Sequence, residues 1–102
     1  MSEHKFALPL PDRVVGTAED GNTGEVARVW IANGNPEIIV RPVFEDPTAM
    51  GQMLAELCWN FAYAYEQRGG ITQEKALAAL RQGWVQGHAQ GDANAKQRAS
   101  QQ

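Results

Sequence analysis

The sequence has few of the residues that build covalent or metal-held structure. Its 102 residues include one cysteine, Cys58, and two histidines, His4 and His88. A single thiol excludes an internal disulfide, and two histidines near opposite ends of the chain offer no metal-ligand spacing. We therefore expect no metal and no cofactor, and a fold held together by packing.

Long apolar runs and an excess of positive charge are also absent. No run approaches the roughly 18 apolar residues of a membrane-spanning helix. The beginning, MSEHKFALPLPDR, lacks the pattern of a signal peptide. The net charge of −3 and the pI of about 5.3 disfavour unaided binding to nucleic acid or anionic membrane. We expect a soluble, cytoplasmic protein with neither nucleic acid nor membrane as a partner.

The composition that is present is that of an ordinary globular domain. Hydrophobic residues make up 43% and charged residues 21% of the chain. A chain of this length forms one domain, here residues 1–102, and can bury about two-thirds of its unfolded surface. No internal repeat is visible.

The N-terminal segment is predicted to lack regular structure. Two prolines bias residues 1–13 toward an extended arm, because each restricts the residue before it. Val14 and Val15 could begin a third short strand. The run EDGNTG at residues 19–24 is dense in turn-forming residues and predicts a loop.

The stretch VWIANGNPEIIVRP predicts an antiparallel β-hairpin within residues 24–44, because two apolar runs flank an Asn-Gly corner. A central pair Gly34-Asn35 sets Ile31 against Ile38, and we favour this register. The alternative pair Asn33-Gly34 is the better turn dipeptide but sets Ile31 against Pro36. The favoured register creates one apolar face, which needs helices to cover it.

Residues 47–90 predict the two helices that could cover this face. Asp46 is a plausible N-cap, and Pro47 suits the first helical position. The first helix runs to about Gln67 and stops before two glycines. Thr72 caps a second helix, from about Gln73 to Gln90, whereas residues 91–102 are predicted to form a polar tail that is either frayed or solvent-exposed.

Each predicted helix carries an apolar stripe at helical spacing. The stripe of the first helix includes Leu57 and Phe61, and that of the second includes Leu77, Leu80 and Trp84. We expect Leu57 to lie in the core. The fold class is therefore α+β: an antiparallel hairpin packed against two C-terminal α-helices.

The hairpin stretch followed directly by DPTAMGQMLAELCW resembles a family of short bacterial proteins, domain of unknown function 5076, found in Caulobacter and its relatives. The resemblance covers most of the chain. It implies an α+β domain and no catalytic residues.

The search for catalytic residues is mostly negative. Cys58 lies beside an apolar stripe without a neighbouring base, so a core thiol is favoured over a nucleophile. His88 reads as a partly buried helical residue rather than a proton-transfer group. Glu45 and Asp46 complement the positive end of a helix better than they form an acid–base pair. No phosphate-binding loop is present.

Three surface features carry hypotheses about binding. In the favoured register Arg28 opposes Arg41 beside Trp30, an unfavourable arrangement unless neighbouring glutamates such as Glu25 or a bound anion compensate. The two arginines and the tryptophan form a candidate anion or ligand site.

A second feature is the pair Trp59 and Tyr63, which lies four residues apart on the side of the first helix opposite Leu57. Such a pair with polar neighbours resembles the centre of an interface. The alternative is that the arm packs over the pair with its alternating Phe6, Leu8 and Leu10.

A third feature is a ridge of small residues at every fourth position of the second helix, centred on Gly83, Gly87 and Gly91. Glycine weakens a helix by about 0.5–1 kcal/mol relative to alanine. Either another helix approaches this ridge closely or the helix unravels after Trp84.

These features lead to two functional hypotheses. The first is a non-catalytic, homo-oligomeric interaction or scaffold module, a homodimer with its interface at Trp59, Tyr63, Gly83 and Gly87. The alternative is a binder of a small molecule or anion, or an enzyme, with a pocket near Arg28, Arg41 and Trp30.

Overall fold

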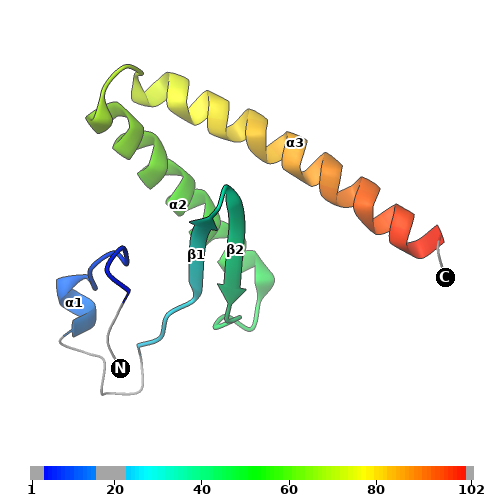
Figure 1. Cartoon of the computed structure of the whole chain (residues 1–102), viewed down its shortest axis with the longest axis horizontal. Helices are drawn as coiled ribbons and strands as arrows, with labels where there is room; N and C mark the ends of the chain where they lie inside the picture. The colour runs from blue at the N-terminus through cyan, green and yellow to red at the C-terminus, as the bar shows by residue number, and fades with distance from the viewer. Residues whose placement is uncertain (1–3, 16–22, 101–102) are drawn as a thin grey trace. The chain divides into compact units, whose positions relative to one another are not determined.

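The computed structural model describes residues 4–15 and 23–100 (Figure 1). The elements are α1 (Asp12–Val15), β1 (Ala27–Ala32), β2 (Asn35–Val40), α2 (Pro47–Arg68) and α3 (Gln73–Ser100). An antiparallel hairpin followed by helices confirms the predicted α+β class. The chain divides into two compact units, Met1–Glu45 and Asp46–Gln102. The packing of the hairpin against the helices stays a prediction, as does the single domain.

The N-terminal unit begins with a turn and a short helix. The amide of Ala7 donates to the carbonyl of His4 at 2.9 Å, so the arm is not extended throughout. Val14 and Val15 lie in α1, and the prediction of a third strand there is wrong. Their amides both donate to the carbonyl of Pro11, which begins the helical turn. The predicted loop at 19–24 lies outside the described residues as far as residue 22.

The hairpin turns on the pair Asn33-Gly34, with φ angles of 54° and 82°. Ile31 therefore pairs with Pro36, and the register that we favoured is wrong. Two positive φ angles define the turn whose twist matches that of the flanking strands, and Asn-Gly adopts it most readily. The two registers differ by two residues in the partner of each β1 residue, so both place the same side chains on each face. The preference of the turn therefore decides the register.

Helix α2 begins and ends as its sequence predicts. Asp46 has extended backbone angles, and its carboxylate accepts a hydrogen bond from the amide of Thr48 at 3.0 Å. At the other end the amide of Gly69 donates to the carbonyls of Tyr65 and Glu66. Gly69 and Gly70 both have positive φ, 99° and 93°, where an L side chain would be strained.

Helix α3 starts at the predicted residue but ends ten residues beyond Gln90. The hydroxyl of Thr72 accepts from the amide of Lys75 at 3.2 Å, which caps the first turn. The helix then continues without a break to Ser100, and residues 91–100 are exposed, so the tail is solvent-exposed rather than frayed. Strong helix formers in the run ANAKQRA offset the glycines before it. The side chains of Gln90 and Asn94 also hydrogen-bond across one turn.

The two long helices form a hairpin that opens away from its connector (Figure 1). Its buried core among the described residues consists of Ala62, Ala76 and Leu77, all within seven residues of the connector at 69–72. Leu57 is 47% exposed, so its predicted place in the core is wrong. Leu57 lies five residues before Ala62, toward the end of α2 where the two helices have separated (Figure 1).

Candidate functional site

The helical unit has a groove between α2 and α3, with a volume of about 810 Å³. Its walls are formed mainly by apolar side chains of both helices, among them Leu54, Phe61, Leu80 and Trp84. The groove exists because the small residues of the core let the helices touch near the connector, while the helices separate beyond it.

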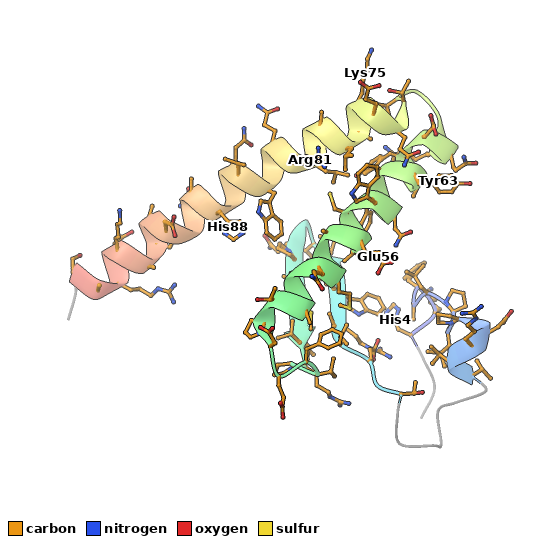
Figure 2. The ribbon with its side chains drawn as sticks, turned by 180° about the vertical axis from the view of Figure 1, so that it is seen from behind. His4, Glu56, Tyr63, Lys75, Arg81 and His88 are labelled. Atoms are coloured by element: carbon orange, nitrogen blue, oxygen red, sulfur yellow. The ribbon has the colours of Figure 1, made fainter. Side chains whose placement is uncertain are left out.

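One charged side chain, Arg81, lines this groove. Its guanidinium lies 5.8 Å from the centre of the Trp59 ring across the helices, and Figure 2 shows it on the side of α3 that faces α2. A cation over an aromatic face is attracted by the ring quadrupole, which holds the guanidinium over the groove. Arg81 was missed by sequence reasoning, although its position four residues after Leu77 places it at the edge of the apolar stripe.

Cys58 lies in the wall of the groove and packs against the small core. The thiol is free and has intermediate exposure. The prediction of a core thiol is therefore correct in its packing but incomplete, because the sulfur also borders open space.

His88 is exposed, and the prediction of a partly buried residue is wrong. Its ring lies 4.5 Å from that of Trp84, with 54° between the planes. Both rings border a smaller hollow on α3, together with Gly87 and Gly91. The histidine thus extends the aromatic surface of α3 beyond the groove.

Trp59 and Tyr63 have different surroundings. Trp59 is 49% exposed and contributes to the groove, where it meets Arg81. Tyr63 is 55% exposed and points away from α3 (Figure 2). The two residues therefore share a helix side by position, but only the tryptophan takes part in the groove.

The predicted small-residue ridge is part of an unbroken helix. A Cβ atom added at Gly83, Gly87 or Gly91 would meet no heavy atom within 4 Å among its described neighbours. Unravelling after Trp84 is thus the wrong alternative. Packing inside the described chain does not require these glycines.

The hairpin arginines do not oppose each other. Arg28 pairs across the strands with Ile39, and the amide of Arg41 donates to the carbonyl of Val26 at 2.8 Å. The guanidinium of Arg28 contacts the carboxylate of Glu25 at 2.9 Å. The two guanidinium groups are therefore not directly opposed, which was the reason for expecting an anion between them. Of the two predicted ways to compensate Arg28, the structure shows pairing with a glutamate.

Trp30 is engaged by the N-terminal arm. The ring of His4 meets it edge-on, with 5.0 Å between centroids, and also lies against Phe6. Leu8 and Leu10 are exposed, at 92% and 58%. The third member of the predicted ligand site is therefore covered in part by the chain itself.

The described residues, 4–15 and 23–100, offer neither a metal site nor a membrane-spanning helix. They contain no group of three or more His, Cys, Asp or Glu side chains placed to hold a metal ion. No helix among them has the length and apolar character needed to cross a membrane.

Comparison with known proteins supplies a structural relative and a family. No curated protein matches the chain. A solved structure from the photosynthetic bacterium Rhodopseudomonas palustrus CGA009, which carries the provisional name pyruvate dehydrogenase, is similar to it. The two are 27% identical with a TM-score of 0.66 over 83% of each chain, so they share a fold. The profile of the family described as domain of unknown function (DUF5076) matches residues 7–90. The chain belongs to this family.

Proposed function

We propose that this protein is a non-catalytic, homo-oligomeric interaction or scaffold module, in which a second copy covers the apolar surface of the helical unit. The observation that carries the proposal is the contrast between what this unit buries and what it exposes. Among its described residues, the buried ones are two alanines and one leucine, Ala62, Ala76 and Leu77.

The exposed apolar surface is much larger than this core. Eight large side chains on the two helices are each more than a third exposed: Leu54, Leu57, Trp59, Phe61, Tyr63, Tyr65, Trp84 and Val85. Apolar surface left in water forgoes about 25 cal/mol per Å². Exposed apolar side chains in this number are typical of an interface or a ligand-binding groove rather than of a free monomer surface.

The ridge on α3 supports the same proposal. Three glycines in an exposed helix weaken it by about 0.5–1 kcal/mol each, and no described neighbour requires them. Close approach of a helix from another copy would give them a role, because the missing side chains allow two backbones to come together. A two-fold axis would use the ridge on both copies at once.

The charge of the chain accords with a protein partner. A net charge of −3 favours neither nucleic acid nor an anionic membrane, and we expect the module in the cytoplasm. The provisional name of the Rhodopseudomonas protein is not carried over, because no carboxylate or imidazole lines the groove to act in catalysis. Anion binding at Arg28 and Arg41 stays the second candidate.

Sedimentation tests the proposal. The wild type is expected to form a dimer at micromolar concentration, and Trp59→Ser/Tyr63→Ser is expected to shift it toward monomer. Ile39→Ser, a comparable loss of an exposed apolar side chain in β2, is the matched control and should leave the dimer unchanged.

Two results would contradict the proposal in different ways. A wild type that stays monomeric would remove self-association altogether. A dimer that survives the double substitution would keep self-association and move its interface, and Gly87→Leu would then test the ridge.

A further inference from the structure

We propose that the groove between α2 and α3 binds an amphipathic monoanion, a free fatty acid, with its carboxylate on Arg81 and its hydrocarbon chain along the apolar walls. This inference goes beyond the proposed function, because the groove is complete within one chain. A second copy would use Tyr63, Val85, Gly87 and Gly91, which do not line the groove, whereas Trp59 and Gly83 do.

The size and shape of the groove suit an extended small molecule. A volume of about 810 Å³ falls within the roughly 300–1,000 Å³ typical of small-molecule sites. The lining extends along α2 from Gly51 to Tyr65, which spans about 21 Å at 1.5 Å per residue. A hollow that is long and open suits an extended chain better than a compact ring system.

The charge of the lining favours a ligand with one negative group. Arg81 is the charged residue among sixteen lining residues, and none of these is acidic. A guanidinium binds a carboxylate through paired N–H donors, which gives the head group both attraction and orientation. Trp59 holds that guanidinium over the apolar wall, so a single ligand can meet both surfaces.

The test compares fatty acids with the alcohols of equal length by calorimetry. Affinity is expected to rise from octanoate to dodecanoate, by up to about fourfold for each added methylene group. Decanoate should bind more tightly than decanol by up to about fivefold, the range of an exposed charge pair. Equal affinities for the acid and the alcohol would overturn the role of Arg81, and no rise with chain length would overturn the groove.

Two arginine variants distinguish binding of the carboxylate by Arg81 from a general attraction of anions to positive charge. Arg81→Gln should abolish the preference for decanoate over decanol and keep the dependence on chain length. Arg68→Gln is the matched control, because Arg68 also stacks on an α2 aromatic ring, Tyr65 at 4.8 Å, but does not line the groove. Equal losses in both variants would overturn the proposal. If Arg81→Gln fails to fold, the acid–alcohol comparison in the wild type still decides.

The rate at which the Cys58 thiol is alkylated measures whether the groove is occupied. Bound dodecanoate should slow its alkylation by N-ethylmaleimide severalfold, because the thiol lies in the wall. Alkylation that slows with protein concentration alone would show a second copy in the groove and overturn the fatty-acid site. Binding to phosphatidylglycerol vesicles without binding of free acid would overturn it in favour of a lipid surface. Sedimentation of the same samples reports self-association separately.

Discussion

At the scale of single residues, backbone conformation decides more of this fold than side-chain burial does. Asn33, Gly34, Gly69 and Gly70 all have positive φ angles and all lie at a reversal of the chain direction. None is buried, yet each fixes how the elements on either side of it meet. The contribution of these residues to stability is therefore conformational.

Gly70→Ala should lower the free energy of unfolding by about 1–2 kcal/mol, because alanine is strained at a φ of 93°. Gly51→Ala is the matched control inside α2, where no heavy atom lies within 4 Å of the added methyl. There alanine should raise stability by about 0.5–1 kcal/mol. Urea unfolding measures both, and equal signs would contradict the role of the connector.

The pairing of Arg28 with Glu25 leads to a second residue-scale prediction. Sulfate and chloride at equal ionic strength should shift the melting temperature equally, because screening of exposed charges does not depend on the anion. Thermal melts of the wild type, Arg28→Gln and Arg41→Gln make the comparison. A sulfate-specific stabilisation that both variants lose would instead establish the anion site.

At the scale of elements, the contact of α2 with α3 rests on few side chains. Leu77→Ala should lower the free energy of unfolding by about 2–5 kcal/mol, because Leu77 is 8% exposed and lies in the core of the helical unit. Leu57→Ala, at a 47% exposed position, should lower it by less than about 1 kcal/mol. Denaturation at low protein concentration tests the pair, and the reverse order would place the core on the other side of α2.

The sequence was informative about these elements wherever a local rule applies. The caps at Asp46 and Thr72 and the stop at Gly69 each depend on a few neighbouring residues, so they could be predicted. The register of the hairpin could not, because a turn preference competed with side-chain matching and both registers kept the same faces.

The groove escaped prediction for a different reason. An apolar stripe on a helix shows which residues avoid water, but not how wide the angle to its neighbour is. Leu57 and Phe61 fit a core stripe by spacing, yet the helices separate before these residues are covered. The place of Arg81 in the groove could not be predicted either, because it depends on the contact with Trp59 on the other helix.

At the scale of the whole molecule, α3 extends past both the predicted helix and the family profile, which ends at residue 90. A chain that stops at Gln90 should still unfold cooperatively with nearly unchanged stability, because the buried core lies near the connector. Its circular dichroism should lose the signal of about ten helical residues. Failure of the shortened chain to fold would show that the last turns of α3 are structural.

The same shortened chain bears on self-association. Gly91 lies beyond the new end, so an interface along the ridge should weaken, whereas an interface at Tyr63 should not. Sedimentation of the shortened chain beside the full chain separates these alternatives.

Because the core lies near the connector, a small change in the angle between α2 and α3 would move the far end of α3 a long way. Helix α3 is 28 residues long, about 42 Å, and the core that joins it to α2 lies near the connector at Gly69 and Gly70. A rotation of about 10° at the connector would move its far end by about 7 Å while the contacts of Ala62 with α3 barely change. A partner or ligand that pushes the helices apart at Trp84 would therefore displace Ser100 about 2.5 times as far as it displaces Trp84.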